Sequence, residues 1–124
     1  MTELTDLTIA EALEAMKNKK ISAKELTNAY IKKMEDGRKY NAYVLETPEV
    51  ALKVAEIADK NYAADTARAL EGIPLGIKDL FCTKGIRTTA CSHIIDNFVP
   101  QYESTVTANL LGAGAGFLGK LNMD

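Results

Sequence analysis

Lys78 is the residue of this chain whose type and position best suit chemistry. It closes the segment 73–78, in which apolar residues alternate with Pro74, Gly76 and Lys78 itself, a pattern typical of a strand. Because Pro74 and Gly76 are small, they leave room on the face that carries the lysine. Burial there would disfavour the charged ammonium, and a neutral amine can act as a general base towards a hydroxyl nucleophile. The alternative is a solvated lysine beside Asp79, since most lysines are exposed, and the pattern leaves both open.

The remaining nucleophiles and metal-binding side chains form no recognisable set. His93 is the only histidine, and no G-x-S-x-G elbow accompanies Ser92 or Ser104, so a histidine-based triad is not supported. Cys82, Cys91 and His93 follow no common zinc spacing and lack a fourth ligand. Small buried thiols and a structural histidine are the favoured interpretation.

Residues 114–120 spell the phosphate-loop pattern G-x-x-x-x-G-K. Such a loop continues with Ser or Thr to hold magnesium, whereas Leu121 stands there, and it requires a strand before it and a helix after it. The order expected here is the reverse. We therefore predict a turn that leads into a buried strand.

Composition limits the classes of function. The chain has 124 residues, 47% of them hydrophobic, with 15 basic and 17 acidic side chains and a net charge of −2. Such a chain can bury a core, but its charge argues against nucleic-acid binding by the chain alone. No apolar run approaches the roughly 20 residues of a membrane span. An acidic start that lacks the features of a signal peptide, together with only two cysteines, predicts a reducing cytoplasm.

The first half of the chain predicts helices with defined starts. Capping boxes at Thr8 and Ser22 predict one helix to about residue 18 and another that ends near Gly37. Residues 41–45 are a short strand candidate. Thr47 is then predicted to cap a third helix, with proline at its first position. The apolar stripe expected on this third helix consists of Val50, Val54, Ile57 and Ala58.

The second half changes to shorter segments punctuated by glycine and proline. Residues 73–78 predict a strand and residues 117–121 a closing strand, and a short helix is predicted from Ser104 or Thr105 to Leu111. Residues 88–92 fit either an extended piece or a loop. Helices followed by strand–helix–strand predict an α/β fold with a helical N-terminal layer.

Four segments resemble motifs of the amidase signature family. They are Gly72–Asp79 (GIPLGIKD), Gly85–Ser92 (GIRTTACS), Tyr102–Val106 (YESTV) and Leu118–Asp124 (LGKLNMD). The resemblance extends over nearly the whole chain and is strongest in the second half. Within the family the chain is most similar to the glutamine-hydrolysing subunits of tRNA-dependent amidotransferases.

This resemblance implies the N-terminal part of a larger fold. Residues 1–124 would form part of a single amidase-signature domain, with a mainly helical layer over 1–63. Residues 64–124 would supply the strand–helix–strand segment that carries the lysine. The sheet would be mixed and truncated, because the last motif normally continues into Glu-Phe-Ala beyond Asp124.

Catalysis in this family uses a serine nucleophile, a second serine in a cis peptide bond, and a lysine. Lys78 matches the lysine position, while Ser92 and Ser104 match neither serine. Both catalytic serines belong to a Gly/Ser-rich stretch that would lie beyond Asp124. The resemblance therefore implies acyl transfer by the longer protein and an inactive 124-residue chain.

The same resemblance implies substrates and partners. Glutamine would be hydrolysed, and its ammonia would pass to a B subunit that activates glutamyl-tRNA(Gln) with ATP and magnesium. A small C subunit would hold the other two together, and the glutamine-hydrolysing subunit itself would need no metal or organic cofactor. Two alternatives remain open: another amidase of the family that acts on a small amide, and a truncated module that mediates interactions without catalysis.

Overall fold

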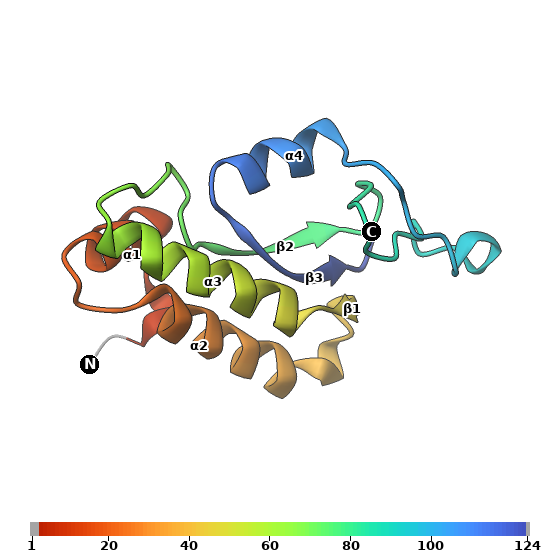
Figure 1. Ribbon diagram of the computed structural model, residues 1–124. Helices are drawn as coiled ribbons and strands as arrows, with labels where there is room; N and C mark the ends of the chain where they lie inside the picture. Colours follow the sequence, from red (N-terminus) through yellow and green to blue (C-terminus); the bar gives the residue numbers. More distant parts are fainter. Residues whose placement is uncertain (1–2, 124) are drawn as a thin grey trace.

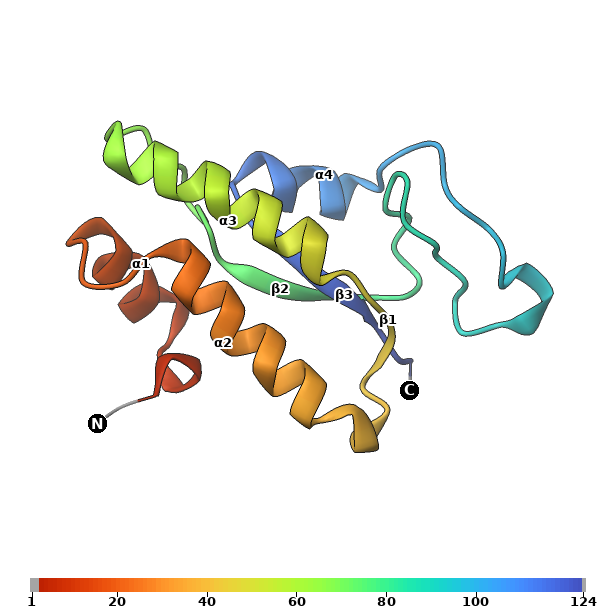
Figure 2. The ribbon, with the colours of Figure 1, turned by 60° about the horizontal axis from the view of Figure 1, so that its bottom comes forward.

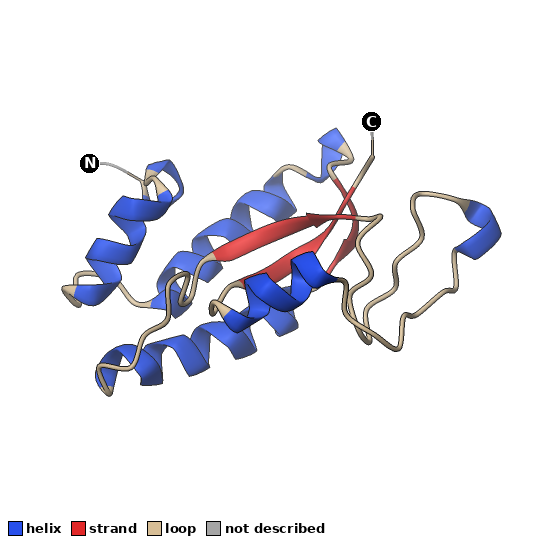
Figure 3. Ribbon diagram, turned by 90° about the horizontal axis from the view of Figure 1, so that it is seen from above, coloured by secondary structure: helices blue, strands red, loops and turns tan. Residues whose placement is uncertain are grey.

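The computed structural model describes residues 3–123 as a small sheet enclosed by helices (Figure 1). Helices α2 and α3 lie side by side on one side of the sheet, and α4 lies on the other (Figures 1 and 3). The elements, in chain order, are η1 (Leu4–Asp6), α1 (Ile9–Lys17), α2 (Ala23–Asp36), η2 (Arg38–Tyr40), β1 (Tyr43–Glu46), α3 (Pro48–Ala63), β2 (Pro74–Lys78), η3 (His93–Ile95), α4 (Thr105–Gly112) and β3 (Gly116–Leu121).

The sheet has three strands in the order β1-β3-β2. The central strand β3 pairs antiparallel with β1 and parallel with β2, so the predicted α/β fold with a mixed sheet is confirmed. The parallel pair places Lys78 opposite Leu121 and Ile77 opposite Lys120. The end of β2 and the end of β3 therefore meet at the same edge of the molecule, beside the C-terminus (Figure 2).

Both predicted capping boxes are present. The Thr8 hydroxyl accepts a hydrogen bond from the Glu11 amide at 3.2 Å, and the Glu11 carboxylate accepts one from the Thr8 amide at 2.8 Å. Ser22 and Glu25 make the same pair of bonds at 3.0 Å each. Each pair satisfies two amide groups that the first turn of a helix leaves without partners. The sequence prediction for α1 and α2 is confirmed, including the cap at Gly37.

Thr47 does not cap α3, and that part of the prediction is wrong. The helix begins at Pro48 as expected, but Thr47 makes no capping hydrogen bond. Its hydroxyl donates to the carbonyl of Phe117 at 3.0 Å, and its amide donates to the carbonyl of Leu118 at 2.8 Å. Proline at the first position already removes one amide that would need a cap. The threonine instead fastens the start of α3 to the central strand.

Small residues allow α3 to approach its neighbours closely. The buried positions of α3 are Ala51, Ala55 and Ala58, whereas the larger Ile57 is 52% exposed. A Cβ atom on Gly116 of β3 would lie 3.1 Å from Cβ of Val54. Glycine at this strand position is therefore explained by the close packing of the helix. Two apolar clusters result, made by Ala12, Met16, Ala23, Leu26, Ala55, Ala58 and Ile73 and by Ile31, Met34, Ala51 and Leu118.

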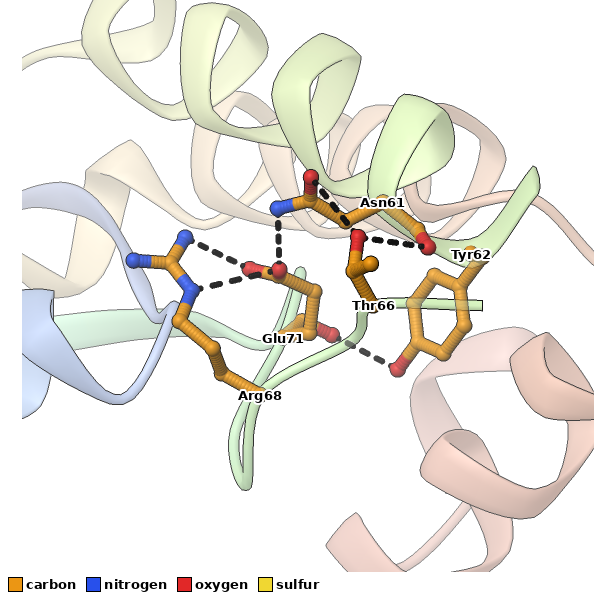
Figure 4. Close-up of polar contacts among 5 residues, drawn as sticks. All are labelled: Asn61, Tyr62, Thr66, Arg68 and Glu71. Atoms are coloured by element: carbon orange, nitrogen blue, oxygen red, sulfur yellow. Dashed lines mark hydrogen bonds and ion pairs between the residues drawn. The ribbon is translucent and has the colours of Figure 1, made fainter. Parts of the chain in front are cut away.

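A buried carboxylate fixes the segment that precedes β2 (Figure 4). Glu71 is fully buried and accepts hydrogen bonds from Arg68 at 2.8 and 3.2 Å and from Asn61 at 2.5 Å. The Tyr62 hydroxyl donates to the Glu71 carbonyl at 2.9 Å. Burial alone would raise the pKa of Glu71, but the bonds from Arg68 and Asn61 outweigh burial and hold this pKa below its usual value.

The lowered pKa of Glu71 predicts a loss of stability in acid. Because the folded state binds the proton less readily than the unfolded state, the stabilisation is complete above about pH 4.5 and is lost as the pH falls below it. At neutral pH, Glu71→Gln should lower the unfolding free energy by about 2 kcal/mol. Urea unfolding of both proteins across this range should show the difference shrinking in acid. A difference that is constant with pH would contradict the assignment.

Gly119 lies where the central strand approaches β1 most closely. A Cβ there would overlap the carbonyl oxygen of Leu45 and lie 2.9 Å from the Tyr43 ring. Gly119→Ala should therefore lower the unfolding free energy by about 3 kcal/mol. Gly112 is the matched control, because it ends α4 and a Cβ added there would meet no atom within 4 Å. Gly112→Ala should raise the unfolding free energy by about 0.5 kcal/mol, and equal losses in both variants would refute this account.

Candidate active site

Lys78 ends the edge strand β2 and is half-buried. The amide of the next residue, Asp79, donates to the carbonyl of Leu121 at 3.1 Å, which continues the pairing with β3. The space predicted beside the lysine is not empty, because side-chain carbons of Leu121 lie 2.9–3.0 Å from the position of a Cβ on Gly76. Small neighbours on β2 thus make room for a residue of β3. The lysine therefore lies in a site that is neither fully solvated nor fully closed.

The chain turns sharply after the lysine. The amide of Phe81 donates to the carbonyl of Lys78 at 3.1 Å and closes this turn. The loop that follows runs through η3 to the cap of α4 and extends away from the sheet (Figure 1). What fixes the turn therefore fixes the end of β2 and the start of the lysine side chain.

Asp79 holds the far part of that loop against the turn. Its buried carboxylate accepts hydrogen bonds from the Thr89 hydroxyl at 2.5 Å, the Thr89 amide at 3.2 Å and the Cys91 amide at 3.3 Å. The Asp79 carbonyl accepts from the Ala90 amide at 2.8 Å. Ala90 and Cys91 both have positive φ, 50° and 55°, a conformation that is costly for residues with side chains. Of the two alternatives that the sequence allowed for 88–92, the segment adopts the loop, and this carboxylate organises it.

Lys120 is the lysine that the fold buries. It lies in the central strand, is 1% exposed, and its ammonium donates to the Phe81 carbonyl at 2.5 Å and to the hydroxyls of Thr83 and Thr88 at 2.7 and 3.3 Å. In the sequence this residue was the last letter of the phosphate-loop pattern and part of the family-like segment Leu118–Asp124, but no role was predicted for it. A lysine inside an otherwise apolar strand was the signal that could have identified it.

The partners of Lys120 require its charged form. The Thr83 hydroxyl donates its proton to the Phe81 carbonyl at 3.2 Å, and the Thr88 hydroxyl donates to the Ile86 carbonyl at 3.1 Å. Both hydroxyls therefore accept from Lys120, as the Phe81 carbonyl does. Lys120 must donate all three hydrogen bonds, and only the ammonium form has the three N–H groups that this requires. Burial lowers the pKa of Lys120, and the nearby carboxylates of Asp79 and Glu103 oppose that shift.

The two serine candidates from the sequence have structural roles, whereas the structural role expected for His93 is not borne out by its exposed position. The Ser92 hydroxyl accepts from the Ile94 amide at 3.2 Å and begins η3, and Ser104 caps α4 by accepting from the Thr107 amide at 3.1 Å. His93 is exposed on the extended loop. Residues 114–120 form a turn into the buried strand β3, so that expectation is confirmed.

The two cysteines are separate, and neither is buried: Cys82 is half-buried and Cys91 is exposed, so the expectation of small buried thiols is wrong. The Cys82 thiol lies 3.3 Å from the Tyr102 hydroxyl, and the Cys91 thiol lies 3.4 Å from Oδ1 of Asn122. Within residues 3–123, no three side chains of His, Cys, Asp or Glu are grouped to hold a metal ion. No helix in the same described range is long and apolar enough to cross a bilayer.

A surface pocket of about 370 Å³ opens beside the loop that Asp79 organises. Lys78 is not one of the residues that line it. The lining comes from β1, the 87–96 loop and the end of β3, with Val44, Arg87, Thr89, Cys91, Ser92, His93, Asp96 and Asn122.

The chain belongs to the amidase family, because the family's model, described as Amidase, matches residues 25–124. It is 60% identical over all 124 residues to the A subunit of the glutamyl-tRNA(Gln) amidotransferase of Beijerinckia indica subsp. indica, and 57% identical to the same subunit of Hyphomonas neptunium. The chain spans 25% of the length of each of these relatives.

Solved amidases have the same fold over this region. The peptide amidase of Stenotrophomonas maltophilia superposes with a TM-score of 0.88 at 28% identity, covering 95% of this chain and 25% of that one. A fatty acid amide hydrolase superposes with a TM-score of 0.90 at 22% identity, covering 98% of this chain and 22% of that one, which shows the fold alone. The arrangement of helices and mixed sheet is therefore that of amidase-signature enzymes.

The organising role of Asp79 can be tested by one isosteric change. Asp79→Asn replaces a carboxylate oxygen that accepts from Thr89 and Cys91 with an amide nitrogen, which cannot accept. The unfolding free energy should fall by about 2 kcal/mol, because a buried donor loses its partner. Asp96→Asn, at an exposed position on the same loop, is the control and should change it by less than about 0.5 kcal/mol. Chemical denaturation measures both, and similar values would remove the role assigned to Asp79.

Proposed function

We propose that this chain is the N-terminal part of the glutamine-hydrolysing subunit of a glutamyl-tRNA(Gln) amidotransferase. The observation that carries the proposal is the 60% identity over all 124 residues to the A subunit of that enzyme. The matched region includes the whole of β2 and the lysine that ends it. Residues 1–124 would belong to one amidase-signature domain, with the helical layer over 1–63 and the lysine-bearing segment over 64–124.

Lys78 would be the catalytic base in this proposal. Its amine would take a proton, through a second serine, from the serine nucleophile, and both serines would come from residues after Asp124. The nucleophile would attack the side-chain amide of glutamine, and the oxyanion of the tetrahedral intermediate would need hydrogen-bond donors. Ammonia would leave with the proton, and water would release glutamate.

The geometry around Lys78 supports such a role. A general base must be held in place relative to the proton it accepts. Lys78 ends a strand that is paired with β3, and the turn after it is closed by the Phe81 amide. The residue as a whole is half-buried, so it is partly removed from solvent.

The proposed complex also assigns the remaining steps to partners. Ammonia would pass to a B subunit, where ATP and magnesium would activate glutamyl-tRNA(Gln), and a C subunit would hold the two together in the cytoplasm. The net charge of −2 fits a protein that leaves most tRNA contacts to its partners. The glutamine-hydrolysing subunit would need no metal or organic cofactor for acyl transfer.

A second candidate is an amidase that acts alone on a small amide. The superposition on the peptide amidase supports it, since that enzyme has the same fold at 28% identity. The 60% identity to the amidotransferase of Beijerinckia indica favours the first candidate. A module that only mediates interactions is the third possibility and would need no role for Lys78.

The proposed function predicts activity only in a longer chain. Glutamine hydrolysis should be absent from the 124-residue chain, because a base without its nucleophile forms no acyl-enzyme. It should appear when the protein is extended to the length of its relatives. In the extended protein, Lys78→Ala should lower kcat by at least about 100-fold, whereas Lys53→Ala, at an exposed position on α3, should leave it unchanged. Ammonia release measures all four proteins.

The contrary outcomes separate the candidates. Hydrolysis of small amides without glutamine hydrolysis, and no co-purification with B and C subunits, would favour the amidase that acts alone. A folded extended protein without any hydrolysis would favour the interaction module. Full activity of Lys78→Ala would show that the base lies elsewhere.

A further inference from the structure

The buried ammonium of Lys120 contacts the turn that follows Lys78. Lys120 donates to the carbonyl of Phe81 at 2.5 Å, and the amide of the same Phe81 donates to the carbonyl of Lys78 at 3.1 Å. The two contacts thus lie on either side of the Phe81 Cα. The position of the Phe81 backbone therefore depends on both lysines.

The remaining two bonds of Lys120 stiffen the loop beyond that turn. Thr83 and Thr88 are buried, and their hydroxyls hold the ammonium between them. The Thr83 amide lies 3.5 Å from the Thr88 hydroxyl, so the two threonines also contact each other. The Lys120 side chain thus attaches residues 81, 83 and 88 to the central strand.

Lys120 and Lys78 are placed to act from opposite faces of the sheet. Lys120 pairs with Ile77 and Leu121 pairs with Lys78, and successive side chains of a strand point to opposite faces. The ammonium of Lys120 is therefore directed away from the side on which the Lys78 amine lies. It can hold the end of β2 without occupying the space that a substrate would need.

We propose that Lys120 is a positioning residue for Lys78, fixing the turn through the Phe81 carbonyl and so fixing the direction of the lysine side chain at the end of β2. The effect of Lys120 on catalysis rests on the proposed function, in which Lys78 is the catalytic base. The mechanical part, the coupling of Lys120 to Lys78, is a property of the chain itself. The two parts are tested separately.

The mechanical part is tested on the 124-residue chain without an activity assay. Each lysine is acylated with acetic anhydride under limiting conditions, and mass spectrometry gives the rate at Lys78 relative to the exposed Lys24 of α2. Lys120→Met keeps the length of the side chain but removes its three donors. The loosened turn should raise the relative rate at Lys78 several-fold, while circular dichroism remains that of the folded chain.

Two further variants keep this test decisive. Thr88→Val removes the longest of the three Lys120 bonds, at 3.3 Å, together with the bond from the Thr88 hydroxyl to the Ile86 carbonyl and the contact with the Thr83 amide. Because the bond from Lys120 to the Phe81 carbonyl remains, this variant should raise the relative rate less than Lys120→Met does. It replaces Lys120→Met if that variant fails to fold. Lys120→Arg retains a charged donor and should restore part of the protection. An unchanged relative rate in folded Lys120→Met, or in folded Thr88→Val where only that variant folds, would overturn the proposal.

The catalytic part is tested in the extended protein. Lys120→Met should lower kcat by about 10- to 100-fold with little change in KM, because a displaced base affects the reaction more than substrate binding. Lys24→Met is the surface control and should leave both unchanged. Altered acylation in an extended protein with no amidase activity would refute the proposed function but not the coupling. Unaltered kcat, with amidase activity present, would refute the positioning role.

Discussion

A buried ammonium in the central strand is the interaction on which the lysine-bearing end of this fold depends. Lys120 has almost no exposure and three hydrogen bonds to oxygens of the loop between β2 and α4. Charges are removed from water at a high cost unless each donor is satisfied, so these oxygens and the lysine require one another. Asp79 makes the complementary arrangement directly after β2, with a buried carboxylate that accepts from Thr89 and Cys91. Lys120 of β3 thus holds the first half of the loop, at residues 81–88, and Asp79 at the end of β2 holds the part that follows, at residues 89–91.

Close backbone approach is the second constraint. The start of α3 is fastened to β3 by Thr47, and the helix presents alanines to its neighbours. Glycines at 116 and 119 provide space for Val54 and for the backbone of β1. Helix, central strand and edge strand are therefore held at distances that larger residues would not allow. The loop after β2 is attached to this rigid layer, and the layer therefore fixes where the loop lies. A site at the ends of strands needs its loops to be fixed in this way.

Local sequence patterns predicted most of the elements. Capping boxes at Thr8 and Ser22 predicted the starts of α1 and α2, and alternation predicted β2, because these signals involve residues a few positions apart. The prediction at Thr47 was wrong because its hydrogen-bond partner lies 70 residues away in β3. The apolar stripe expected on the third helix shifted towards its alanines for the same reason: the neighbour that selects the buried face is distant in sequence. Lys120 was overlooked because its three acceptors come from a segment more than thirty residues earlier.

The sequence alone determined the family, the α/β order of the elements and the choice of Lys78 as the candidate catalytic residue. These follow from motifs and from periodicity along the chain. The catalytic role of Lys78 stays a prediction. Only the tertiary structure decided which lysine is buried, what fills the space beside Gly76, and that Asp79 organises residues 89–91. The physical reason is that burial and hydrogen bonding of a charged side chain depend on groups brought together by folding. A lysine that ends one strand and a lysine inside the next look alike in sequence, and the surrounding oxygens distinguish them.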